Sequence, residues 1–266
     1  MPVIRHPEGA IYYEVYGAGF PVLLLLPQSK GPNGTHLLVK SLSRIFSVIL
    51  FDQLDTGRSL ANSDEYDASI SERVSEVNCL LDHLQLREAH LFCHSTGCGL
   101  GIAYADSFSD RVKTLSLVNP WSYADEQLIT MQNLRIEAAQ HLSPYTYAHF
   151  NFTILFPAIY KRKHTEAFED LAIAAKSSPH NADQIKKRLN SILDYDTRLF
   201  TPRITSPSLV ISSKDDLLMP SWHADNIANG IKNTTKYCLN FGGHMLPETR
   251  SKQISWLTRK FLKSHS

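Results

Sequence analysis

The stretch Cys93-His94-Ser95-Thr96-Gly97 constrains the fold of this chain more than any other. A mostly apolar run, residues 89–92, precedes it, and residues 98–107 have the pattern of a helix. A serine on a tight turn between strand and helix needs small neighbours, because the two elements approach closely there. Gly97 meets this requirement, and Cys93 stands where glycine is usual. Such a turn exposes the serine hydroxyl, and the helix N-terminus presents backbone N–H groups to a developing negative charge.

Short apolar runs alternate with helical patterns at both ends of the chain. The continuous apolar run at 21–26 is typical of a strand that is buried on both faces of a parallel sheet. The alternation predicts an α/β fold with a mostly parallel central sheet flanked by helices. The expected strands are 10–16, 21–26, 46–51, 89–92, 113–118, 207–212 and 235–240, and the expected helices are 36–45, 71–86, 98–107, 221–231 and 251–263.

The alternation stops between residues 122 and 199, where helical patterns dominate and no strand is evident. We expect residues 1–121 and 200–266 to form the core, and 122–199 to form a helical cap inserted after the sixth strand. In open α/β sheets ligands bind at the carboxyl ends of the strands, so the insertion is a candidate lid. The alternative is a structural insertion that lies far from the site.

Composition narrows the function and the location. A net charge of +1 over 266 residues gives no basic surface for nucleic acid or an anionic membrane. No apolar run approaches the roughly 20 residues of a membrane span. The four cysteines form no C-x-x-C pair, and the first residues lack the apolar segment of a signal peptide. We therefore expect reduced thiols and a cytoplasmic protein, and we leave the oligomeric state open.

Ser95 needs a base and an acid, because a serine hydroxyl is a poor nucleophile until its proton is removed. Among twelve histidines, His244 is the best candidate for the base, because it follows two glycines after the expected strand 235–240. Asp215 and Asp216 follow the strand 207–212 directly, and only one of them can point into the site. The chain order is then serine, aspartate, histidine, the order that α/β-hydrolases use.

From end to end the chain resembles the small, capped serine hydrolases of the α/β-hydrolase fold family. Residues 51–59, Phe-Asp-Gln-Leu-Asp-Thr-Gly-Arg-Ser, resemble the family loop D-Q-R-G-x-G-x-S, with departures at Leu54 and Asp55. Residues 111–120 resemble its segment P-x-R-V-x-x-L-x-L-V-x-P, and Gly243-His244 matches its G-H. The acid of the family lies four residues before a proline, here Pro220. The resemblance therefore selects Asp216 over Asp215.

Within the family, the chain is most similar to the aminoacrylate hydrolases of pyrimidine catabolism. Those enzymes often lack a serine at the elbow, whereas this chain has Ser95, so the likeness bears on architecture more than on substrate. The likeness to the aminoacrylate hydrolases rests on five short segments, residues 119–121, 156–158, 188–191, 213–220 and 241–244.

The resemblance also implies an oxyanion hole. The first donor is the backbone N–H of Thr96, which directly follows the nucleophile. The family usually has His-Gly after the second buried strand, and the next residue supplies the second donor. This chain has Pro27-Gln28 there, so Ser29 takes the donor position, and the turn departs from the family pattern.

These features predict a serine hydrolase, of the esterase kind, that cleaves a small carboxylic ester, lactone, thioester or amide through an acyl-enzyme on Ser95. This chemistry needs no metal and no organic cofactor. One alternative is a C–C bond hydrolase or an acyltransferase with the same triad. Another is a non-catalytic small-molecule receptor on a hydrolase scaffold.

The expected substrate pocket combines residues near the elbow with residues of the insertion. Arg135 is a candidate to pair with a carboxylate of the substrate, as a small acidic acyl substrate would need. The aromatic residues of the insertion are expected either to form a pocket wall or to pack the insertion on the core. The candidate substrate-binding residues are Gln28, His94, Trp121, Arg135, Phe156 and Tyr160.

Overall fold

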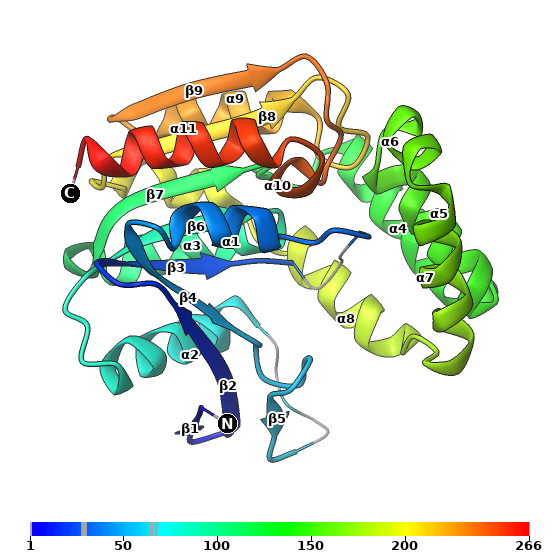
Figure 1. Ribbon diagram of the computed structural model, residues 1–266, viewed down its shortest axis with the longest axis horizontal. Coiled ribbons are helices and arrows are strands. Elements are labelled where there is room, and N and C mark those ends of the chain that lie inside the picture. Colours follow the sequence, from blue (N-terminus) through cyan, green and yellow to red (C-terminus); the bar gives the residue numbers. More distant parts are fainter. Residues whose placement is uncertain (1, 28–30, 64–65, 67–68, 266) are drawn as a thin grey trace.

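A mostly parallel sheet runs through the molecule, with the strand order β1-β2-β4-β3-β6-β7-β8-β9 (Figure 1). The computed structural model describes residues 2–27, 31–63, 66 and 69–265. From β4 to β9 all neighbours are parallel, whereas β2 pairs antiparallel with β1, β4 and β5. The strands are β1 (Val3–His6), β2 (Gly9–Tyr16), β3 (Phe20–Leu25), β4 (Phe46–Phe51), β5 (Leu60–Ala61), β6 (Ala89–His94), β7 (Val112–Val118), β8 (Ser208–Ser213) and β9 (Thr234–Leu239).

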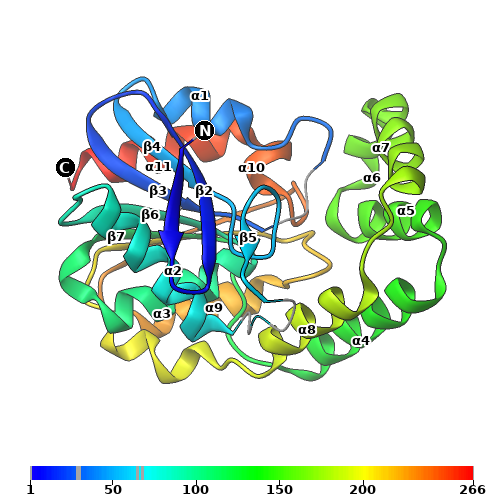
Figure 2. The same cartoon turned by 90° about the horizontal axis from the view of Figure 1, so that it is seen from below.

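Helices cover both faces of the sheet, because the central strands are apolar on both sides. In β3, Val22 and Leu24 pack under α1 (His36–Leu42) and α11 (Ser251–Lys263). Leu23 and Leu25 point the other way, to the cluster that includes α2 (Ile70–His83), α3 (Thr96–Ser107) and α9 (Ser221–Gly230). Figure 2 shows these two helical layers on opposite sides of the strands. Each fully buried aliphatic side chain contributes about 1.5–3 kcal/mol to stability, so the two clusters fix the sheet firmly.

Five α-helices are inserted between β7 and β8, and we call them the inserted helices. They lie together beyond the carboxyl ends of the parallel strands (Figure 1). Asp125 caps the first of them by accepting a hydrogen bond from Leu128 N at 2.8 Å. The inserted helices are α4 (Glu126–His141), α5 (Pro144–Leu155), α6 (Ala158–Lys163), α7 (Thr165–Ser177) and α8 (Ala182–Leu193). Without the two-residue β5, the strand before them is the sixth. The exact division at residues 121 and 200 stays a prediction.

Several ends of elements differ from expectation for local reasons. β6 continues to His94 and α3 begins at Thr96, so one residue makes the turn between them. α2 ends at His83 rather than near Leu86, because Gln85 is left-handed (φ 54°) and Leu86 N donates to Leu81 O at 2.9 Å, a common helix-ending motif. The short elements β1, β5 and α10 (Leu246–Thr249) were not expected. The structure has no helix, in the part of the chain it describes, that is long and apolar enough to cross a membrane.

Candidate active site

Ser95 is held in a strained conformation by fixed neighbours. Its backbone has φ 55° and ψ −121°, which costs a residue other than glycine about 1–3 kcal/mol. Its N–H donates to Val118 O of the next strand at 3.0 Å, and its carbonyl accepts from Cys98 N at 2.8 Å. A Cβ at Gly97 would lie 2.0 Å from Leu25 O, so only glycine fits there. The strain therefore holds the serine hydroxyl above the end of the sheet.

The cysteine at position 93, where the family pattern has glycine, is accommodated by a glycine elsewhere. The Cys93 side chain is fully buried against α3. A Cβ at Gly101 would lie 2.3 Å from Cys93 Sγ, so the absence of a side chain at 101 makes room for the sulfur. The departure from the expected motif is thus compensated inside the same strand–turn–helix unit.

The structure brings the three residues of the predicted triad together. His244 Nε2 lies 2.7 Å from Ser95 Oγ, and His244 Nδ1 lies 2.8 Å from Asp216 Oδ2. Ser95 is 4% exposed and His244 is 1% exposed, so water has little access to these hydrogen bonds. The arrangement can transfer a proton from the hydroxyl to the imidazole while the carboxylate fixes the ring.

Asp216 is held by three further donors. The N–H groups of Leu218 and Met219 both donate to its Oδ1 at 2.9 Å. Asn119 Nδ2 donates to Oδ2, the oxygen that faces His244, at 2.7 Å. The sequence analysis did not single out Asn119 for this position. The signal that could have identified it is its place directly after β7, at the carboxyl edge of the sheet.

Asp215 supports the loop that carries His244. Its carboxylate accepts from Gly242 N at 2.9 Å, from Gly243 N at 2.8 Å and from the Ser213 hydroxyl. Burial raises the pKa of the Asp215 carboxyl, but these hydrogen bonds outweigh burial and hold the pKa below its usual value. Gly243 is left-handed (φ 63°), so the loop turns sharply just before His244. The two neighbouring aspartates therefore have different roles: Asp216 binds the imidazole, and Asp215 binds the loop that carries it.

Replacing Asp215 with alanine separates these tasks. We expect Asp215→Ala to lower kcat about 10–100-fold, because two part-buried N–H groups lose their acceptor at about 1–3 kcal/mol each. Asp215→Asn keeps an oxygen in that position, so its loss stays within about tenfold. Asp225→Ala, at a half-exposed aspartate of α9, is the control. Steady-state ester hydrolysis measures all three, and a wild-type rate for Asp215→Ala would contradict the supporting role.

The backbone of His244 is held on both sides. Its N–H donates to Leu155 O of α5 at 3.1 Å, and its carbonyl accepts from His94 Nε2 at 2.8 Å. Burial, followed by the neighbouring His244, lowers the pKa of His94 to about 3, so the His94 ring is neutral. His94 was expected to bind substrate, but it lines neither of the two cavities described below. Its contacts make it a support for the base.

Glu248 joins a core loop to the inserted helices. It is buried and accepts from Gly31 N, from Asn33 N and from the Tyr160 hydroxyl, each at 3.0 Å. Phe156 packs against the same loop so closely that a Cβ at Gly31 would lie 2.3 Å from its ring. Phe156 and Tyr160 were expected to bind substrate, yet neither lines the two cavities. Sequence reasoning missed Glu248, because its partners are far away along the chain.

Gln28 and Ser29 lie outside the described residues. Ser29 therefore remains an oxyanion donor by resemblance only, and Gln28 remains a predicted substrate contact. Pro27, just before them, lines the smaller of the two cavities.

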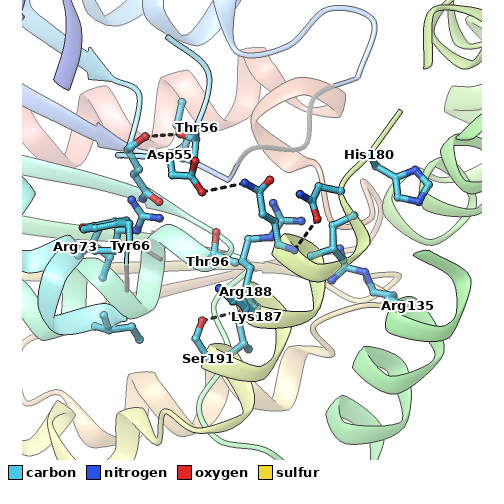
Figure 3. Close-up of a pocket in the computed structure, with 18 of the residues that line it drawn as sticks. Asp55, Thr56, Tyr66, Arg73, Thr96, Arg135, His180, Lys187, Arg188 and Ser191 are labelled. Carbon is cyan, nitrogen blue, oxygen red and sulfur yellow. Dashed lines mark hydrogen bonds between the residues drawn. The ribbon is translucent and has the colours of Figure 1, made fainter. Parts of the chain in front are cut away.

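A cavity of about 390 Å³ lies beside the elbow (Figure 3). Loops and helix residues of the core line one side, including Thr96 and Trp121, and residues of α4, α5 and α8 line the other. Trp121 was among the expected pocket residues, and its ring also packs on α3, where a Cβ at Gly99 would lie 2.3 Å away. The volume suits a small molecule.

A second, smaller cavity of about 20 Å³ touches the triad itself. Ser95 and His244 line it, and so do Thr96, Arg135 and Arg188, which also line the larger cavity. Arg135 was expected at the pocket, whereas Arg188 was not proposed as a site residue. These shared residues connect the reactive serine with the larger space.

The comparisons with known proteins agree with this geometry. A family model described as "alpha/beta hydrolase fold" matches residues 21–251. The chain belongs to the α/β-hydrolase fold family. A protein of Azorhizobium caulinodans named putative carbamate hydrolase RutD is 27% identical to this hydrolase over 92% of this chain and 91% of its own. The expected likeness to hydrolases of pyrimidine catabolism is confirmed, although the relatives' names specify carbamate rather than aminoacrylate.

Solved structures share the whole fold of this hydrolase. The enol-lactonase of Burkholderia xenovorans LB400 superposes with a TM-score of 0.83 at 21% identity, covering 98% of this chain and 100% of the other. MGS-M2, an α/β hydrolase from a Medee basin deep-sea metagenome library, gives 0.89 at 20% identity, with 98% and 97% covered. At these identities the likeness concerns the fold.

Proposed function

We propose that this hydrolase cleaves a small carboxylic ester, lactone, thioester or amide through an acyl-enzyme on Ser95. The observation that carries the proposal is the continuous hydrogen-bonded line from Ser95 Oγ through His244 to Asp216, with distances of 2.7 and 2.8 Å. Each residue comes from a different strand end, and each has supporting contacts of its own.

In the first half of the reaction, Ser95 Oγ attacks the carbonyl carbon of the substrate while His244 Nε2 takes the hydroxyl proton. The Asp216 carboxylate accepts from His244 Nδ1–H, so Nε2 has its lone pair toward the serine, and the carboxylate stabilises the imidazolium that forms. The tetrahedral intermediate collapses as the bond to the leaving group breaks. His244 returns its proton to that group, and an acyl ester on Ser95 remains.

The negative charge on the tetrahedral oxygen needs donors. Thr96 is the first residue of α3, so its N–H is unused by the helix and points out of the N-terminus together with the positive end of the helix dipole. Removing one such donor typically costs 10²–10³-fold in kcat. The second donor is assigned to Ser29 N–H by resemblance.

In the second half, water attacks the acyl carbon and His244 takes a proton from it. Ser95 leaves with that proton, and the free acid departs. A carbamate presents a comparable acyl carbon, so the name of the relatives makes carbamates a second substrate class to assay. We further propose that the inserted helices act as the cap that shapes the pocket.

A burst experiment tests the acyl-enzyme directly. Mixing the hydrolase with excess p-nitrophenyl acetate is expected to release about one equivalent of p-nitrophenol per active site before the steady state, because acylation of an activated ester outruns deacylation. Intact-protein mass spectrometry is expected to show one acetyl group on Ser95. A non-catalytic receptor would release no p-nitrophenol above the rate in buffer and would carry no acetyl group on Ser95. These two results together would exclude the proposed mechanism, whereas steady turnover without a burst would show only that acylation is the slower step.

A further inference from the structure

Two arginines that the proposed chemistry does not use line both cavities. Arg135 belongs to α4 and Arg188 to α8, and these two helices pack against each other. Figure 3 shows Arg135 reaching from α4 toward α8, and Arg188 beside Thr96. Both arginines line the smaller cavity together with Ser95.

Arg135 is buried without a carboxylate partner among the described residues. Its side chain is 6% exposed. Its Nη1 donates to Gln132 Oε1 at 2.9 Å, and its Nε has no hydrogen-bond partner within the part of the chain that the structure describes. A buried cation without an anion is costly. Proteins tolerate such local costs mainly at functional sites, so the group calls for an anionic ligand.

The larger cavity carries more basic than acidic side chains. Burial, followed by the charge of Arg188, lowers the pKa of Arg135 to about 10, so the group is still protonated at neutral pH. One carboxylate, Asp55, occurs in the described lining, and it accepts from Gln184 Nε2 at 2.9 Å. The basic side chains of the lining are Arg73, Arg135, Lys187 and Arg188, of which Arg73 pairs with Glu76 at 2.7 Å.

We infer that Arg135 and Arg188 bind a free carboxylate of the substrate, in addition to the carbonyl that Ser95 attacks. The inference rests on the proposed function and narrows it to acidic acyl compounds, such as half-esters of small dicarboxylic acids. A planar guanidinium donates two parallel hydrogen bonds to a carboxylate, which gives both strength and orientation. The unpaired Arg135 Nε is then satisfied when substrate is bound, and the carboxylate positions the carbonyl at the serine.

A matched pair of esters tests the inference. Monoethyl glutarate and ethyl pentanoate have the same length, and only the first carries a carboxylate. We expect wild type to prefer monoethyl glutarate in kcat/KM. Arg135→Met and Arg188→Met are each expected to lower kcat/KM for monoethyl glutarate about 10–100-fold, the range for a hydrogen bond to a charged group, and to change ethyl pentanoate less than about threefold. For Arg135→Lys, we expect a kcat/KM for monoethyl glutarate between those of wild type and Arg135→Met. Lysine keeps the positive charge but cannot donate two parallel hydrogen bonds to the carboxylate.

The matched control is Lys186→Met, which removes an exposed cation of α8 that lines neither cavity. It should leave the ratio of the two substrates unchanged. Equal losses for both esters in the arginine variants, or no preference in wild type, would overturn the inference. If wild type hydrolyses ethyl pentanoate and Ser95 reacts with a fluorophosphonate, such a result leaves the proposed function standing. If Ser95 does not react at all, the proposed function itself fails.

Two measurements are independent of turnover. Calorimetry on Ser95→Ala should show that monoethyl glutarate binds. Adding Arg135→Met should weaken this binding about tenfold or more, and adding Lys186→Met should leave it unchanged. Absence of binding to Ser95→Ala would contradict the inference. Arg135→Met should also raise the Tm by about 2–4 °C, because it removes an unpaired buried charge. A fall in Tm would instead indicate that the arginine serves the fold.

Discussion

Replacing Ser95 with alanine is expected to lower esterase kcat by roughly 10⁴-fold or more, the loss typical of a triad serine. Among the described residues no other serine hydroxyl hydrogen-bonds to His244, and the strained turn places the Ser95 hydroxyl at the imidazole. The same change should abolish labelling by a fluorophosphonate, which reacts only with an activated hydroxyl.

Ser191→Ala is the matched control for this experiment. Ser191 lines the larger cavity, but its hydroxyl donates to Arg188 O at 2.8 Å and does not touch His244. It should keep both labelling and activity. Fluorophosphonate labelling that persists in Ser95→Ala at another serine would show that the nucleophile has been misassigned.

Asp216→Asn is expected to cost about 10⁴-fold in kcat with little change in structure. Two N–H groups, those of Leu218 and Met219, require an oxygen at the Oδ1 position, whereas only Asn119 Nδ2 donates to Oδ2 besides the imidazole, so we expect the new amide nitrogen at the Oδ2 position, facing His244. The Asn119 amide then turns over, so that its Oδ1, which has no partner among the described residues, accepts from that nitrogen. The ring nitrogen Nδ1 must then accept, which places the ring proton on Nε2. In that tautomer Nε2 has no lone pair for the serine proton.

The tautomer can be observed directly. In ¹⁵N-labelled protein, the His244 signals should show protonated Nδ1 in wild type and protonated Nε2 in Asp216→Asn. Far-UV circular dichroism and the Tm should match wild type, which separates loss of the tautomer from loss of the fold. If Asp215→Asn rather than Asp216→Asn gave the large loss, the assignment of the two aspartates would be reversed.

The sequence was sufficient for the framework of the site because each part is a local signal. The serine, the two aspartates and the histidine each lie within a few residues of the end of an expected strand, and strands of a parallel sheet end at one edge. Ser95, Asp216 and His244 could therefore be placed together before any coordinates. The choice between Asp215 and Asp216 needed the family pattern, since both follow the same strand.

The residues around the triad could not be predicted in this way. The partners of Glu248 lie 88 to 217 residues away along the chain, so no local pattern connects them. Aromatic composition does not distinguish a pocket wall from a packing contact, so the sequence left both roles open for Phe156 and Tyr160. In the structure neither residue lines the two cavities, and Tyr160 donates to Glu248. Arg188 lies in one of the short segments that support the likeness to the aminoacrylate hydrolases, residues 188–191. However, only the packing of α8 on α4 brings it near Arg135.

Glu248 limits how the inserted helices can be exchanged between relatives. The Glu248 carboxylate binds the loop after β3 through two N–H groups and binds α6 through the Tyr160 hydroxyl. If the inserted helices are replaced by those of a relative, the new insertion must therefore provide a hydroxyl at the position of Tyr160. A chimaera with phenylalanine at that position would leave the buried carboxylate with one donor fewer, at a cost of about 1–3 kcal/mol. Libraries that recombine cores and insertions should therefore treat Glu248 and Tyr160 as a single inherited unit.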